Sequence, residues 1–262
     1  LVVGLGFGEN FIASDPQALR PVTDRFIFLE EGEIAEISAG DVSIFGLSSE
    51  SVQSRAVSLD DQRDASNKGS FRHYMLKEIY EQPETVAATL AERVTDRRVL
   101  EHAFGIDAPA IFAKAQAVQI VACGSSYYTS LVARYWIEQL TGLPCSVEIA
   151  SEIRYRKAAV QPDTLFVTIS QSGETADTLA AFRHADGYLA SLCICNVPNS
   201  TLVRESDLSL MIHAGPEIGV ASTKAFTNQL TNLLLLTLAL GRTNGIDEAI
   251  EAEIVGALRK LP

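Results

Sequence analysis

The chain has 262 residues, of which 47% are hydrophobic and 21% charged, a composition typical of a globular protein and not of a disordered one. Its formal net charge of -12 disfavours nucleic acid as a partner, because a polyanion is repelled unless a local basic patch outweighs the average. The densest basic run, residues 154–157, fits a solvated helix face. No apolar run approaches the ~20 residues that a membrane span needs, so no membrane partner is expected either.

The first 62 residues have a strand-like pattern. Short apolar runs at residues 1–3, 26–29, 33–37 and 41–45 are strand-like, and the turn signals at 31–32 and 39–40 predict that the last three form an antiparallel meander. Such a piece has too little core to be a domain by itself, which predicts that residues 1–62 are the closing part of a larger α+β domain. Because Leu1 lies inside the first apolar run, we expect the protein to extend beyond it.

A glycine-rich string, Gly4-Leu5-Gly6-Phe7-Gly8, follows the first apolar run. Its spacing differs from the dinucleotide fingerprint, and no helix with a second parallel strand is predicted after it. We therefore interpret it as a turn between a strand and a helix, not as a nucleotide site.

Polar residues dominate from 60 to 68, which predicts a linker at residues 63–72, followed by helices at 73–81 and 84–96. Beyond residue 115, apolar β-branched runs at 118–121, 165–169 and 189–195 alternate with helical stretches, with shorter candidates at 146–149 and 208–212. This alternation predicts an α/β fold with a parallel sheet covered by helices on both faces. Such a sheet binds ligands at the carboxyl ends of its strands.

Two strand-to-helix turns combine a glycine with several hydroxyls: residues 123–127 (CGSSY) and residues 170–175 (SQSGET). Unpaired N–H groups and the positive end of the helix dipole make such a position an anion site. Ordinary helix capping by Ser and Thr is the alternative reading of either turn alone. A third small-residue turn, residues 219–224 (GVASTK), precedes an apolar helix at 225–240 and could close the same site.

The string at residues 170–178 (SQSGETADT) resembles the phosphosugar-binding signature of sugar isomerase (SIS) domains. Further segments resemble the glutamine-dependent fructose-6-phosphate aminotransferase (glucosamine-6-phosphate synthase) family, in the family's order and over essentially the whole chain. Those of its synthase half are residues 73–83 (HYMLKEIYEQP), 148–156 (EIASEIRYR) and 219–227 (GVASTKAFT). Those of its glutaminase domain are residues 8–15 (GENFIASD) and 28–32 (FLEEG).

The resemblance implies a flavodoxin-like, three-layer αβα SIS domain within residues 73–262, preceded by a remnant of an Ntn-type glutaminase domain at 1–62. It also implies a set of contacts to the substrate, with Ser125 standing where many members have Thr. The expected substrate-binding residues are Ser125, Ser126, Ser170, Gln171, Ser172, Thr175, Val220 and Ser222. We interpret Glu174 as an acid that matches the helix dipole and not as a catalyst.

For the parent protein, the resemblance implies conversion of fructose 6-phosphate and glutamine to glucosamine 6-phosphate, without a cofactor or metal, in a cytoplasmic homodimer. The family's catalytic cysteine, glutamate, histidine and lysine belong to segments outside this chain. We therefore expect the chain to bind the sugar phosphate and to contain no catalytic residue of its own. Its four histidines are scattered, and its cysteines, which show no zinc-site spacing, are expected to be free buried thiols: Cys123, Cys145, Cys193 and Cys195.

Two other readings stay open. An SIS module can sense a sugar phosphate in a regulator that carries a DNA-binding helix-turn-helix, although the acidic, β-rich N-terminal segment disfavours a DNA reader. A stand-alone phosphosugar isomerase is the second, and it leaves residues 1–62 without an explanation.

Overall fold

A computed structural model of the chain describes residues 1–14, 16–30, 32–46, 51–52, 55–58 and 68–262. These residues form two compact units, Leu1–Gly69 and Ser70–Pro262. The expected domain boundary at residue 62 and residues 63–67 of the expected linker lie outside the described residues.

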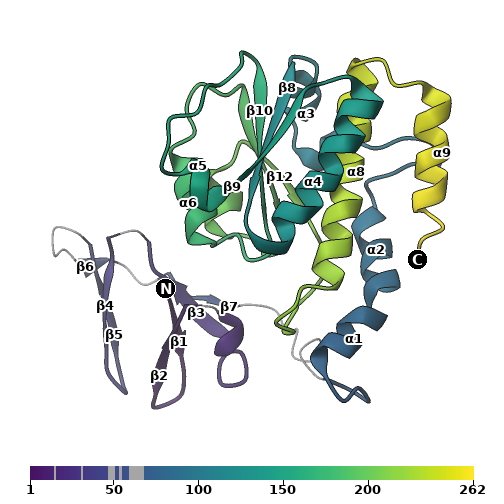
Figure 1. The fold of residues 1–262 in the computed structure, drawn as a ribbon. Helices are drawn as coiled ribbons and strands as arrows, with labels where there is room; N and C mark the ends of the chain where they lie inside the picture. The colour runs from purple at the N-terminus through teal and green to yellow at the C-terminus, as the bar shows by residue number, and fades with distance from the viewer. Residues whose placement is uncertain (15, 31, 47–50, 53–54, 59–67) are drawn as a thin grey trace. The chain divides into compact units, whose positions relative to one another are not determined.

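The first unit contains two antiparallel sheets (Figure 1). The strand order is β2-β1-β3-β7 in one sheet and β4-β5-β6 in the other. The strands are β1 (Val2–Leu5), β2 (Asn10–Ala13), β3 (Arg25–Phe28), β4 (Ile34–Ile37), β5 (Val42–Phe45), β6 (Ser51–Val52) and β7 (Val57–Ser58), with a 3-10 turn η1 (Pro16–Ala18) after β2.

The predicted meander is right for β4 and β5, which pair antiparallel, but wrong for β3, which pairs with β1 and β7 instead. The reason is burial on both faces of β3. Phe26 packs with Val2 on one face, and Ile27 packs with Val3 and residues of the second sheet on the other. A strand that is apolar on both faces is placed between neighbours, not at the edge of a hairpin.

The glycine-rich string joins β1 to β2 in an antiparallel hairpin, so the expected turn between a strand and a helix is wrong. The Gly6 N–H donates to the Glu9 carbonyl at 3.0 Å, and Gly8 has a φ of 74°. That left-handed conformation suits glycine and reverses the chain into a second strand.

The second unit is built on a five-stranded sheet whose strands are all parallel, in the order β12-β11-β10-β8-β9. The strands are β8 (Ala117–Ala122), β9 (Cys145–Ile149), β10 (Thr164–Ser170), β11 (Ala190–Cys195) and β12 (Leu208–Met211). Counted along the chain this is the doubly wound order 2-1-3-4-5, in which the strand order reverses between β8 and β10. The predicted parallel α/β sheet is confirmed.

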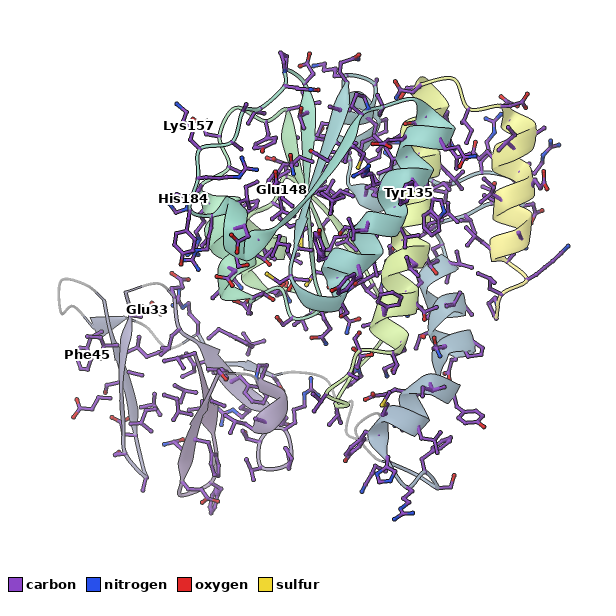
Figure 2. The ribbon with its side chains drawn as sticks, in the orientation of Figure 1. Glu33, Phe45, Tyr135, Glu148, Lys157 and His184 are labelled. Atoms are coloured by element: carbon purple, nitrogen blue, oxygen red, sulfur yellow. The ribbon has the colours of Figure 1, made fainter. Side chains whose placement is uncertain are left out.

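Helices cover both faces of this sheet (Figure 1). Successive strand residues point to opposite faces, so strands that are apolar throughout must bury side chains on both. On β8, Val118 and Ile120 belong to the large core shared with the helices α2, α3, α4, α8 and α9, whereas Val121 packs with residues of α5 and α6. Figure 2 shows Tyr135 on the α4 side and His184 on the α6 side. The helices are α1 (Tyr74–Tyr80), α2 (Gln82–Leu90), α3 (Ala108–Phe112), α4 (Gly124–Thr141), α5 (Ala150–Ile153), α6 (Ala176–Arg183), α7 (Thr201–Glu205), α8 (Lys224–Thr243) and α9 (Glu248–Leu258), with a 3-10 turn η3 (Glu101–Phe104).

The helix expected at residues 84–96 ends six residues early. Glu92 adopts a φ of 60°, which an α-helix does not accommodate, and Val94 then bridges to Val99. In the part of the chain that the structure describes, no helix is both long and apolar enough to cross a bilayer.

Candidate functional site

The candidate site lies at the carboxyl ends of β8 and β10, on the two sides of the point where the strand order reverses. The helix α4 begins directly after β8, and α6 begins six residues after the end of β10. In a doubly wound sheet this crevice is the usual ligand position, because two helix N-termini point at it. The two hydroxyl-rich turns predicted from the sequence occupy this place.

The turn at residues 170–175 is closed by its own side chains. The Ser170 hydroxyl oxygen accepts from the Gly173 N–H at 3.0 Å and lies 3.0 Å from the Thr175 hydroxyl oxygen. The Ser172 hydroxyl oxygen accepts from the Glu174 N–H at 3.1 Å. Ser170 is buried, whereas Gln171, Ser172 and Thr175 are half-buried. Ser170 therefore shapes the turn, and the other three side chains remain partly accessible.

Gly173 is required at the middle of this turn. Its φ is 68°, and a Cβ built there would lie 2.0 Å from the Ser200 hydroxyl oxygen and 2.7 Å from the Cys195 sulfur. No side chain fits, so the turn packs directly on the end of β11 and the start of α7. The turn after β10 is thereby held against the end of β11 and the start of α7.

Glu174 was expected to match the dipole of its own helix α6, but its carboxylate contacts a different helix. Its carboxylate accepts from the Thr201 N–H at 2.7 Å and so caps the N-terminus of α7. This contact engages the carboxylate in holding α7, which agrees with a structural and not a catalytic role.

The first turn places two adjacent serines differently. Ser125 is exposed, whereas Ser126 is buried and its carbonyl accepts from the hydroxyls of Thr129 at 2.7 Å and Ser130 at 2.8 Å. Cys123, which precedes this turn, is half-buried; Cys145, Cys193 and Cys195 are buried, as predicted.

The third turn is organised by Glu217, a residue that the sequence reading missed. Its carboxylate accepts from the Ser222 hydroxyl at 3.0 Å and from the N–H groups of Thr223 at 2.8 Å and Ala225 at 3.1 Å. Because the Ser222 hydroxyl donates to Glu217, it can only accept from a ligand, so it suits a sugar hydroxyl and not a phosphate oxygen. Val220 is fully exposed, so its backbone and its isopropyl group are accessible to a ligand.

The three turns belong to one edge of the sheet. Asn196, at the end of β11, donates its N–H to the Gln171 carbonyl at 3.2 Å and its side-chain amide to the Gly215 carbonyl at 2.7 Å. The Thr129 hydroxyl oxygen lies 3.3 Å from the side-chain oxygen of Gln229, which brings the second turns of α4 and α8 together. The structure therefore brings the predicted residues to neighbouring segments, with Asn196 and Glu217 as supports that the sequence did not reveal. An acid shortly before a helix was the one available signal, and it marks Glu217.

The first two turns contain no lysine or arginine, so an anion there would be held by amides, hydroxyls and helix dipoles. Among the described residues, no group of three or more His, Cys, Asp or Glu side chains could hold a metal ion. A cavity of about 220 Å³ in this unit lies elsewhere, lined by Phe166, Tyr188 and the end of α6, and none of the predicted site residues lines it.

Comparisons with known proteins find a family model and several relatives that match this chain. Residues 111–239 match the SIS domain family. Two glutamine–fructose-6-phosphate aminotransferases are similar over 100% of this chain: one from Pseudomonas putida is 62% identical over 265 residues, and one from Escherichia coli K12 is 56% identical over 264. The chain spans 43% of the length of either relative.

Two solved structures resemble the second unit and part of the chain's sequence. The C-terminal domain of glucosamine-fructose-6-phosphate aminotransferase from Francisella tularensis is 50% identical, with a TM-score of 0.72 over 74% of this chain and 55% of that one. A putative phosphosugar isomerase from Silicibacter pomeroyi is 29% identical, with a TM-score of 0.56 over 71% of this chain and 55% of that one. The chain therefore carries an SIS domain at residues 111–239 and is similar over its whole length to glutamine–fructose-6-phosphate aminotransferases.

Proposed function

We propose that the protein containing this chain transfers the amide nitrogen of glutamine to fructose 6-phosphate and isomerises the product to glucosamine 6-phosphate. In this proposal the second unit supplies the sugar-phosphate half-site. The observation that carries it is the pair of hydroxyl-rich turns at the carboxyl ends of β8 and β10, in a chain 56–62% identical to aminotransferases of that name. The names of these relatives supply the substrates.

Within the half-site, the phosphate would occupy the turn at residues 170–175 and the N-terminus of α6. Ser172, Thr175 and Gln171 would bind its oxygens, with Ser170 holding the turn. The sugar chain would extend toward Ser125 and Ser126 on one side and toward Val220 and Ser222 on the other. The acceptor character of the Ser222 hydroxyl supports this orientation, because sugar hydroxyls are donors and phosphate oxygens at neutral pH are mostly not.

For the remaining parts, residues 1–62 would be the closing part of the glutaminase domain, residues 63–72 the linker, and residues 73–262 the synthase part with its first SIS domain. The separation of the described residues into compact units that end at Gly69 and begin at Ser70, within the proposed linker, supports this division. We further propose a cytoplasmic homodimer. Light scattering on the purified parent protein tests the dimer. A measured mass equal to one subunit would contradict it.

Sugar-phosphate binding by the chain itself is tested by titration with fructose 6-phosphate, monitored by calorimetry and by backbone amide NMR. We expect weak binding, with the largest shifts at residues 124–126 and 170–176. The parent protein should form glucosamine 6-phosphate only when glutamine is supplied. Isomerisation without glutamine would favour the stand-alone isomerase reading, and shifts confined to other residues would remove the two turns from the site.

A further inference from the structure

A buried carboxylate outside the three turns supports the third of them. Glu78 lies in α1 and is 2% exposed, so its charge is withdrawn from water. Its Oε1 accepts from the Ile218 N–H at 2.6 Å and from the Gly219 N–H at 3.0 Å. A buried carboxylate is costly unless hydrogen bonds compensate it, and two consecutive amides of the loop are those partners.

The fit between this carboxylate and the loop is tight. A Cβ added at Gly219 would lie 2.5 Å from the Glu78 Oε2 and 3.4 Å from the Met75 Cα. The loop can approach α1 this closely only because residue 219 is glycine. Glu78 and Gly219 are therefore matched to each other across 141 positions of sequence.

Two carboxylates thus hold the two ends of the third turn. Glu78 fixes the amides of Ile218 and Gly219, and Glu217 fixes Ser222 and the amides that begin α8. The tip between these anchors, at Val220 and Ala221, is exposed. A tip pinned on both sides presents its groups in one geometry, which is the condition for selective contact with a ligand.

We propose that Glu78 is a positioning residue that sets the selectivity of the site for the hydroxylated part of a sugar phosphate over its phosphate group alone. The proposal rests on the proposed function, which places the phosphate at residues 170–175. The Ser222 hydroxyl gives its proton to Glu217, so it can accept from a sugar hydroxyl but has no proton to donate to a phosphate oxygen. Loss of Glu78 should therefore weaken contacts to the sugar and spare those to phosphate.

The test measures the affinities of fructose 6-phosphate and of inorganic phosphate for the 262-residue chain by calorimetry or NMR titration. Glu78→Ala should weaken fructose 6-phosphate binding by about tenfold, the value of one ordinary hydrogen bond between the displaced turn and the sugar, and leave phosphate binding within about twofold. Glu78→Gln keeps one acceptor oxygen, so its affinity for fructose 6-phosphate should lie between those of Glu78→Ala and the unsubstituted chain. Glu84→Gln, an exposed acid in the next helix, is the matched control and should change neither affinity.

Gly219→Ala should reproduce the selective loss, and should cost little more in a Glu78→Ala background because its methyl group then meets space. In parallel, the amide protons of Ile218 and Gly219 should lose protection from hydrogen exchange in Glu78→Ala. Equal weakening of both ligands, or no weakening, overturns the proposal. Failure of the unsubstituted chain to bind fructose 6-phosphate instead refutes the proposed function, and unchanged protection of both amides refutes the clamp independently of any ligand.

Discussion

The hydroxyl oxygens of Ser170 and Thr175 lie 3.0 Å apart and close the turn that follows the central strand β10. The same Ser170 oxygen accepts from the Gly173 N–H at 3.0 Å, so a single buried side chain fixes both arms of the turn. The Ser172 hydroxyl contacts the Glu174 N–H of the same turn and stays half-buried. We therefore expect Ser170 to contribute to the stability of the turn and Ser172 to contribute mainly to ligand binding.

Ser172→Ala should weaken fructose 6-phosphate binding by about 1–3 kcal/mol, the value of a hydrogen bond to a charged group, with the free energy of unfolding unchanged within about 0.5 kcal/mol. Ser170→Ala should weaken fructose 6-phosphate binding and lower the free energy of unfolding, each by about 1 kcal/mol or more. The reason is that it leaves the Gly173 amide without its acceptor. Calorimetry and urea unfolding measure the two effects. Ser146→Ala, on the exposed face of β9, is the control. An unchanged affinity in Ser172→Ala would remove that residue from the site.

Gly173→Ala should be far more costly than another left-handed glycine replaced by alanine. Gly142, at the end of α4, has a φ of 71° but no atom within 4 Å of an added Cβ. Gly142→Ala should thus lose about 1 kcal/mol of unfolding free energy from backbone strain alone. Gly173→Ala adds a clash with Ser200 and should lose about 2–4 kcal/mol. Urea unfolding of both variants checks this, and equal losses would contradict the close packing described here.

The sequence predicted those parts of the fold that local patterns encode. Continuous apolar runs such as residues 165–169 marked the buried parallel strands, and the hydroxyls at residues 170–175 marked the turn after β10. The partners of β3 were not predictable in this way, because a strand's neighbours depend on which distant apolar faces it meets. The end of α2 was missed for a related reason, since the left-handed Glu92 carries no glycine to signal it.

Within the site, the sequence predicted groups close together along the chain and missed those that come from far away. Glu78 read as one acid in a helix, and only the folded chain brings it against Ile218. Glu174 showed the converse: its position suggested a role in its own helix, but its carboxylate is engaged by the N–H of Thr201. Backbone donors carry no sequence signature, so a carboxylate that binds them cannot be found from residue types alone.

The ion pair between Lys224 and Glu81 gives a stability prediction. Lys224 is 3% exposed and its amine lies 2.8 Å from the Glu81 carboxylate. Glu81→Gln should lower the unfolding free energy by about 2–3 kcal/mol, because it leaves a buried ammonium unpaired. Adding Lys224→Met should recover most of that loss. Glu138→Gln, in an exposed pair with Arg134, should change stability by less than about 0.5 kcal/mol. If the double variant is no more stable than Glu81→Gln, the unpaired Lys224 ammonium is not the cause of the lost unfolding free energy.

The thiol of Cys145 should make stability fall in alkaline solution. Burial, with a smaller contribution from nearby Glu138, raises the pKa of Cys145 from its ordinary value of 9.0 to about 12. Between these values the unfolded chain loses the thiol proton while the folded chain keeps it. The folded state therefore binds more protons, and its contribution to stability, complete below pH 9, is lost as pH rises toward 12. The expected slope from this group is about 1.4 kcal/mol per pH unit.

Cys145→Val and Cys145→Ala isolate that slope from the tyrosines and lysines that titrate in the same range. Urea unfolding at several pH values between 8.5 and 10.5 should show the free energy of the unsubstituted chain falling more steeply than that of either variant. The two variants should share the shallower slope, although Cys145→Ala should be less stable at every pH because it leaves a cavity. Parallel slopes for all three proteins would mean that Cys145 ionises as readily folded as unfolded, which its burial beneath α4 argues against.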